Sequence, residues 1–134
     1  MAEVQSRKKE LKFRGKTIEE LKQLGVREFA QFLKSRQRRA VLRQFHEIEK
    51  FLARANKKIS KNKQVKTHDR EIVVVPEMVG MKIQVYTGKA FEPIEVTGNM
   101  LGHRLGEMAL TRTRVKHGSA GVGATKGSRA KSKK

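Results

Sequence analysis

The sequence predicts an α+β fold in which short helices pack with a small antiparallel β-sheet of about three strands. Apolar residues recur at helical spacings between residues 17 and 56, and β-branched residues alternate with polar ones between residues 72 and 96. After residue 110 the chain has no apolar period, and we expect a disordered or extended tail. We predict one domain with extensions, divided into a basic N-terminal extension (1–16), a helical region (17–56), an α+β core with a β-hairpin (57–110) and a basic, glycine-rich tail (111–134).

The helical region begins with a recognisable start signal. Thr17 and Glu20 fit a capping box, in which the Thr17 hydroxyl accepts from the Glu20 amide and the Glu20 carboxylate reaches back. Gly25 is expected to end this first helix, and residues 29–33 mark a second helical piece. The next apolar residues are spaced by three and four and predict one face of a further helix: Val41, Phe45, Ile48, Leu52 and Ala55.

Strand patterns follow a stretch of lysines. Residues 57–66 read KKISKNKQVK and are expected to be a solvated basic linker. Ile72–Val75 is a β-branched run ended by proline, which predicts a strand. Residues 81–86 and 91–96 alternate on either side of a glycine-containing turn and predict a hairpin, with Pro93 placing the second strand at an edge. Asn99 is a candidate cap for a short helix ended by Gly106.

The charge balance predicts the class of partner. The chain has 32 Lys/Arg against 13 Asp/Glu, a formal net charge of +19. Such an excess favours a polyanionic partner, of which nucleic acid is the commonest, over an anionic membrane surface or an acidic protein. No apolar run approaches the roughly 20 residues that span a bilayer, and we expect no membrane partner. Cysteine is absent, which excludes disulfides and thiolate metal sites.

No constellation of catalytic residues is evident. Residues 15–17 read GKT, like the end of a phosphate-binding loop, but position 10 is Glu where that motif requires glycine. The glycines of the tail lack the spacing and the strand–helix context of a nucleotide loop. The four histidines have no metal-ligand spacing: His46, His68, His103 and His117. We therefore predict a protein that is not an enzyme and has no catalytic residue, cofactor or metal site.

The manner of nucleic-acid binding is also constrained. Sheet-based RNA readers stack bases on paired aromatic residues, whereas the predicted strands offer only Tyr86 and Phe91. We therefore expect base stacking not to be the main device. Charge delivered by short segments and by the tail suits recognition of the backbone and shape of folded RNA.

Several motifs in residues 72–118 are distinctive. They are VPEMVG at 75–80, TGK at 87–89, LGHRLGE at 101–107 and TRT at 111–113. In this order and spacing they resemble small-subunit ribosomal protein family nineteen. Residues 17–43 look like the helical N-terminal extension of its archaeal and eukaryotic members.

The resemblance implies a structural constituent of the small ribosomal subunit that binds rRNA in the head of that subunit. It further implies a position beside protein thirteen and near a contact with the large subunit, with the tail reaching toward tRNA and the decoding site. A cytoplasmic, ribosome-bound protein is therefore expected. The alternative from another class is a free-standing basic RNA- or DNA-binding chaperone or chromatin protein.

The candidate site residues are basic side chains in the helical region, the hairpin, the LGHRLGE motif and the tail. On a helix Arg36, Arg39 and Arg43 share one face, from which Arg38 is displaced. We expect Glu107 to form local hydrogen bonds or ion pairs. The predicted rRNA-binding residues are Arg36, Arg38, Arg39, Arg43, Lys82, Lys89, His103, Arg104, Arg112, Arg114, Lys116 and His117. The candidate residues for contacts with tRNA or the decoding region are Lys126, Arg129, Lys131, Lys133 and Lys134.

Overall fold

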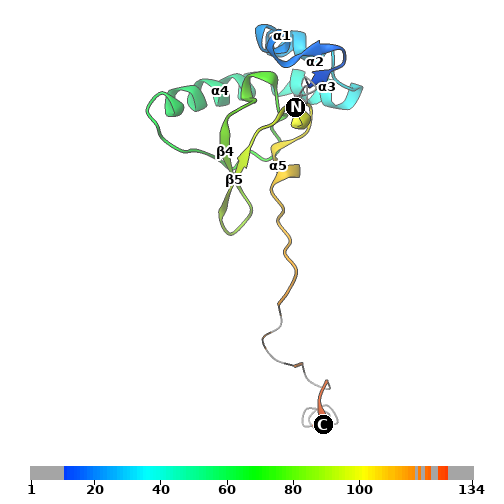
Figure 1. Ribbon diagram of the computed structural model, residues 1–134, viewed down its shortest axis with the longest axis vertical. Helices are drawn as coiled ribbons and strands as arrows, with labels where there is room; N and C mark the ends of the chain where they lie inside the picture. The colour runs from blue at the N-terminus through cyan, green and yellow to red at the C-terminus, as the bar shows by residue number, and fades with distance from the viewer. Residues whose placement is uncertain (1–10, 117, 119, 122–123, 127–134) are drawn as a thin grey trace, which may run out of the picture.

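The computed structural model describes residues 11–116, 118, 120–121 and 124–126. The first four helices lie toward one end of the molecule, the three-stranded sheet extends from them, and the last helix lies beside the sheet where the tail begins (Figure 1). The α+β class is confirmed, and the sheets have two and three strands. None of the described helices is long and apolar enough to cross a bilayer.

A small hairpin precedes the first helix. Strands β1 (Lys12–Phe13) and β2 (Lys16–Thr17) pair antiparallel around Arg14 and Gly15, which both have positive φ, as a tight two-residue hairpin turn requires. Helix α1 (Ile18–Gln23) follows with the predicted capping box: the Glu20 amide donates to Thr17 Oγ1 at 3.4 Å and the Thr17 amide to the Glu20 carboxylate at 3.3 Å. The start signal is confirmed, and the strands lie partly in the predicted extension.

The long helix face predicted after residue 34 is divided between two helices. After α2 (Val26–Ala30), α3 (Ser35–Arg43) ends and α4 (Phe45–Ile59) begins at Gln44, whose backbone is not helical. Residues from both sides of the break are buried, so the predicted packing face is confirmed and the continuity of the helix is not. A break at one residue lets each helix turn its own apolar face to the same core.

The three-stranded sheet has the order β3-β4-β5. Strands β4 (Lys82–Tyr86) and β5 (Phe91–Glu95) form the predicted antiparallel hairpin, with Ile83 opposite Ile94. Pro93 lies on the edge strand as expected. The sheet as a whole is mixed rather than antiparallel, because β3 (Val65–Thr67) runs parallel to β4.

The third strand lies in a different segment from the one that the sequence predicted. β3 lies at the end of the stretch expected to be a linker, where only Val65 and Thr67 are buried and Lys66 between them is exposed. Ile72–Val75 is instead a fully buried connection, with a single bridge from Val73 to Arg104. Periodicity does not distinguish a buried strand from another buried segment, and two inward residues among lysines are too few to show a pattern.

The short helix expected between Asn99 and Gly106 is not formed as predicted. The chain forms a 3-10 turn, η2 (Gly98–Met100), and then α5 (Leu105–Met108), with Gly106 inside the helix rather than at its end. Another 3-10 turn, η1 (Pro76–Met78), follows the buried connection. The buried connection is held to the segment between η2 and α5 by two hydrogen bonds. The Val74 amide donates to the His103 carbonyl, and the Gly102 amide donates to the Val74 carbonyl.

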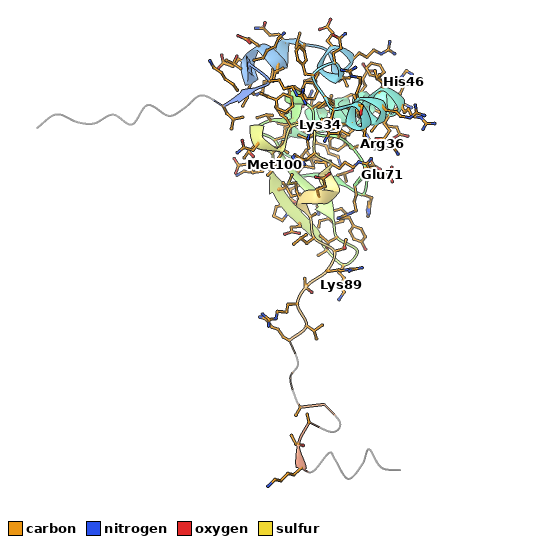
Figure 2. All side chains as sticks on the ribbon, turned by 90° about the vertical axis from the view of Figure 1, so that its right-hand side faces the viewer. Lys34, Arg36, His46, Glu71, Lys89 and Met100 are labelled. Atoms are coloured by element: carbon orange, nitrogen blue, oxygen red, sulfur yellow. The ribbon has the colours of Figure 1, made fainter. Side chains whose placement is uncertain are left out.

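One hydrophobic core joins the helices to the sheet. It includes Leu21 of α1, Phe29 of α2, Val41 of α3, Ile48 of α4 and Val85 of β4, all fully buried. The tail leaves this body after α5, on the side to which the β4–β5 hairpin points (Figures 1 and 2). Residues 111–116 are exposed and have no helix or strand, in agreement with an extended tail.

Candidate nucleic-acid interface

Four predicted site residues meet in one shallow pocket. Arg36, Arg39 and Arg43 project from α3 at spacings of three and four, and Arg104 reaches the same place from the residue before α5. The pocket has a volume of about 300 Å³, and its remaining lining residues are Ala40 and Gln44, so no acidic side chain lines it. We call this site the arginine pocket; Arg36, one of its lining residues, is labelled in Figure 2. Several exposed guanidinium groups around one hollow suit a phosphate group.

Arg38 lies outside the arginine pocket, as its helical position predicted. Its Nε donates to the carbonyl of Ala30 at 3.2 Å and its Nη2 to that of Gln31 at 2.6 Å. These carbonyls are at the C-terminal end of α2, where backbone acceptors lack partners within the helix. The structure therefore gives Arg38 a contact that stabilises the fold, and its rRNA contact stays a prediction.

His103 is fixed by a neighbour one helical turn away. Its Nδ1 lies 2.7 Å from the Glu107 carboxylate, and both side chains are about half exposed. This hydrogen bond lowers the pKa of Glu107 below its ordinary value, with a smaller opposing effect from burial. The local interaction expected for Glu107 is confirmed. It restrains the orientation of the His103 ring.

The two predicted lysines of the hairpin are far apart along it. Lys82 is the first residue of β4 and lies opposite Glu95, whereas Lys89 is in the turn at the tip. Both are exposed, and Figure 2 shows Lys89 where the hairpin ends, near the start of the tail. The structure thus brings Lys89, but not Lys82, to the side of the molecule from which the tail leaves.

The tail presents a further set of cations. Arg112, Arg114, Lys116 and Lys126 are all exposed. The other predicted tail residues lie outside the described part of the chain: His117, Arg129, Lys131, Lys133 and Lys134.

Sequence reasoning missed Arg70, which links the sheet to the segment just before the tail. Its guanidinium donates to three backbone carbonyls: Tyr86 at the end of β4, Gly106 in α5 at 2.8 Å, and Ala109 just before the tail. A Cβ at Gly106 would lie 3.0 Å from the Arg70 carbonyl oxygen, so any side chain there would crowd this contact. No signal in the sequence distinguishes Arg70 from the other arginines of a basic chain, since its acceptors are backbone atoms far away in sequence.

Little of the positive charge is neutralised within the protein. Among the described residues the ion pairs are Arg54 with Asp69, at 3.8 Å, and the pair of His103 and Glu107. The arginine pocket and the described part of the tail contain no such pair. A surface with this excess of cations suits a polyanion, the class of partner that the composition predicts.

Comparisons with known proteins agree with the family resemblance of residues 72–118. Residues 34–117, more than half of the chain, match the family model described as ribosomal protein S19. The protein named small ribosomal subunit protein uS19 from Methanocella arvoryzae is 46% identical over 123 residues, which cover 92% of this chain and 86% of that relative. The protein of the same name from Methanococcoides burtonii is 42% identical over 123 residues, covering 92% and 88%.

The matched region contains the arginine pocket, the hairpin, α5 and the first residues of the tail. The likeness to family nineteen inferred from residues 72–118 is therefore confirmed and extends further toward the N-terminus. Both relatives are archaeal and match most of the chain, which agrees with an N-terminal region of the archaeal and eukaryotic type. The chain belongs to the ribosomal protein S19 family.

Proposed function

We propose that this protein is a structural constituent of the small ribosomal subunit, which it joins by binding small-subunit rRNA through its cationic surfaces. Membership of the ribosomal protein S19 family supports the ribosomal role. The arginine pocket carries the RNA-binding part of the proposal, since four arginines from two separate segments converge there without an acidic partner. Phosphate oxygens of a folded RNA supply the missing negative charge.

The tail is the second proposed contact. Its described residues are exposed, and ordering a backbone costs about 1–2 kcal/mol per residue in conformational entropy. No apolar burial offsets this cost in residues 111–116, whereas contacts of Arg112, Arg114 and Lys116 with phosphates do, with release of counterions. The predicted contacts of Lys126 and of the residues beyond it extend the same proposal toward tRNA and the decoding site.

The position within the subunit rests on the likeness to the family. That likeness supports a place in the head, beside protein thirteen and near a contact with the large subunit. Lys82, Lys89 and His103 are proposed to add further rRNA contacts from the hairpin and from the segment before α5. In this arrangement the protein has no catalytic part in translation and acts by holding RNA and neighbouring proteins in place.

Sedimentation tests the ribosomal role. The tagged protein is expressed in a host carrying the matching ribosomes, and cell extract is separated on a sucrose gradient. We expect it to co-migrate with small subunits in a one-to-one ratio and to remain bound in moderate salt. A protein spread through the light fractions, or bound to DNA, favours the free-standing chaperone or chromatin alternative and contradicts the proposal.

Crosslinking tests the contacts. Purified small subunits are irradiated, and crosslinked peptides are identified at single-residue level. We expect crosslinks to rRNA from the arginine pocket and from Arg112 to Lys116. Crosslinks confined to neighbouring proteins would leave the ribosomal role in place and contradict the proposed RNA contacts.

A further inference from the structure

Three aromatic rings meet on the outer face of the three-stranded sheet. The ring centroids of His68 and Tyr86 are 4.6 Å apart, those of His68 and Phe91 5.1 Å, and those of Tyr86 and Phe91 5.2 Å. His68 is exposed, and the other two rings are half-buried. We call this cluster the ring platform. It comes from three segments and does not belong to the hydrophobic core.

The register of the sheet explains why the rings meet. Side chains alternate along a strand, so the burial of Ile83 and Val85 in β4 places Tyr86 on the opposite, outer face. Tyr86 pairs directly with Phe91 of β5. The parallel pairing of β3 with β4, in which Thr67 lies opposite Val85, brings the next residue, His68, beside Tyr86.

Tyr86 is anchored within the platform by its hydroxyl and by its backbone. The Tyr86 hydroxyl donates to the Gly88 carbonyl in the hairpin turn at 2.8 Å, and the Tyr86 carbonyl accepts from Arg70. Asp69, the acidic residue next to His68, is engaged elsewhere, with Thr67 and Arg54. A rigid aromatic surface loses little conformational entropy when a planar ligand stacks on it.

Cations lie near the rings. Lys66 Nζ lies 5.4 Å from the centroid of the Phe91 ring. Two residues further along their strands, Gln84 and Pro93 line a groove of about 720 Å³. Three lysines also line this groove, against one acidic residue, Glu77: Lys22, Lys63 and Lys82. The outer face therefore combines aromatic rings with neighbouring positive charge, the two devices that proteins use for unpaired nucleotides.

We propose that the ring platform stacks an unpaired base of the RNA, while Lys66 and the lysines of the groove contact the phosphates on either side. This inference rests on the proposed function and deepens it by assigning single-stranded or looped-out RNA to the sheet. It revises the expectation that base stacking is not a main device. The expectation was based on Tyr86 and Phe91 alone. The third ring, His68, directly follows β3, a strand that the sequence did not predict.

A cross-strand aromatic cluster also stabilises a hairpin without binding anything, and the test separates the two roles. Tyr86 is the sole tyrosine of the chain. Replacing tyrosine by 3-fluorotyrosine during expression therefore gives one fluorine resonance, which reports on the platform in the full-length protein. Two probes are titrated: a short single-stranded oligoribonucleotide, and an abasic oligomer of equal length with the same phosphates.

We expect the base-containing oligomer to move the resonance upfield, because a stacked base adds its ring current, and the abasic oligomer to bind with little shift. If both oligomers bind and neither moves the resonance upfield, or both do so equally, the stacking proposal is overturned and the proposed function survives. If neither oligomer binds even at low salt, the proposed RNA-binding function fails as well.

Variants supply an independent measurement. Phe91→Leu keeps an apolar side chain at the platform and removes a ring, and we expect it to weaken binding of the base-containing oligomer by roughly fivefold to a hundredfold. Phe91→Tyr keeps the ring and should restore affinity. The matched control is Phe32→Leu. Phe32 is also half-buried beneath a lysine, with Lys16 Nζ 4.6 Å from the centroid of its ring, but it belongs to the helical region and not to the sheet.

All variants are compared after their folding has been verified by circular dichroism. Equal affinity of Phe91→Leu and the unmodified protein for the base-containing oligomer would overturn the proposal. So would an equal loss with the abasic oligomer, because that outcome assigns Phe91 a purely structural role.

Discussion

The guanidinium of Arg70 is the most connected side chain between the sheet and the start of the tail, with three backbone carbonyls as acceptors. We expect Arg70→Ala to lower the free energy of unfolding by about 2–4 kcal/mol, because it leaves partly buried carbonyls without a charged donor. Arg70→Lys should recover less than half of this loss, since an ammonium group lacks the planar arrangement of donors.

Urea denaturation measures both effects. The matched control is Arg54→Ala, an exposed arginine whose ion pair with Asp69 spans 3.8 Å, and its loss should stay within about 1 kcal/mol. If Arg70→Ala is no more destabilising than the control, Arg70 does not hold the end of β4 to α5.

Gly102 is a residue whose backbone favours glycine and whose surroundings leave little room for a side chain. Its φ is +80°, and a Cβ there would lie 2.9 Å from the Leu33 Cδ2 atom in the core. We expect Gly102→Ala to lower the free energy of unfolding by about 1–3 kcal/mol, through backbone strain and displacement of Leu33. The control is Gly118→Ala, because a Cβ at Gly118 meets nothing within 4 Å. Equal unfolding midpoints for the two variants would contradict this explanation.

The pair of His103 and Glu107 predicts a pH dependence. The hydrogen bond from His103 lowers the pKa of Glu107 below its ordinary value of 4.5 in the folded protein. Because the pKa is lower in the folded protein, the pair stabilises the fold fully at pH values above the ordinary pKa of Glu107. This stabilisation is lost as the pH falls through the lower pKa of the folded protein. We expect Glu107→Gln to cost less than about 1 kcal/mol at neutral pH, because both side chains are half exposed.

Denaturation curves of the unmodified protein and of Glu107→Gln at a series of pH values test this dependence. The difference in unfolding free energy should shrink as the solution becomes more acidic than the ordinary pKa of Glu107. A difference that stays constant through that range would show that the carboxylate is not responsible.

Individual contacts were predictable only where they are local in sequence. Thr17 with Glu20 and His103 with Glu107 lie three and four residues apart, so residue type and spacing were enough to predict an interaction. Arg70 with Ala109, and Val74 with His103, depend on how distant segments pack. No local pattern encodes such contacts, which is why Arg70 was missed.

Among the elements, predictability followed the strength of the periodic pattern. β4 and β5 each alternate over five residues around a glycine-containing turn, and the hairpin was predicted correctly. β3 has three residues, of which two face inward, and Ile72–Val75 is apolar without alternation. The first pattern is too short and the second has no period, so the third strand was placed in the wrong segment.

In the candidate site, too, only the part encoded by local spacing was predictable. The helical spacing of Arg36, Arg39 and Arg43 is enough by itself to place these three on one face. Arg104 is sixty-one residues beyond Arg43, and only the bridge between Val73 and Arg104 and the packing of α5 bring it to the same pocket. The sequence thus predicted the helical side of the arginine pocket but not its completion.

The face of α3 that borders the arginine pocket can be tested as a unit. We expect the triple variant with Arg36, Arg39 and Arg43 replaced by glutamine to remain folded, because all three side chains are exposed and glutamine is a good helix former. Its affinity for small-subunit rRNA should fall, and the slope of log K against log salt should decrease by about 0.7–0.9 for each phosphate that the variant no longer neutralises.

Arg38→Gln is the matched comparison on the same helix. A loss of about 1 kcal/mol in stability with an unchanged salt slope would assign Arg38 to the carbonyls of Ala30 and Gln31, whereas a smaller slope would support the predicted rRNA contact. An unchanged slope in the triple variant would contradict the role proposed for the arginine pocket.

Across the whole molecule, charge and burial are divided between separate parts. The core unites helices and sheet, whereas residues 111–116 are exposed and carry cations without an acidic partner among the described residues. Folding and RNA binding should therefore respond differently to loss of the tail. The predicted boundary at residue 111 gives the position at which to separate them, just beyond the last contact of Arg70.

Deleting residues 111–134 removes eight of the 32 basic residues and no acidic one. We expect the unfolding free energy to change by less than about 0.5 kcal/mol at high salt, and to rise slightly at low salt because repulsion among like charges is reduced. Affinity for small-subunit rRNA should fall, and so should its salt slope, since fewer counterions are released. Urea denaturation and filter binding at several salt concentrations measure the two responses. If truncation unfolded the core, the tail would be part of the folding unit; if it left the salt slope unchanged, the tail would have no place in the proposed RNA interface.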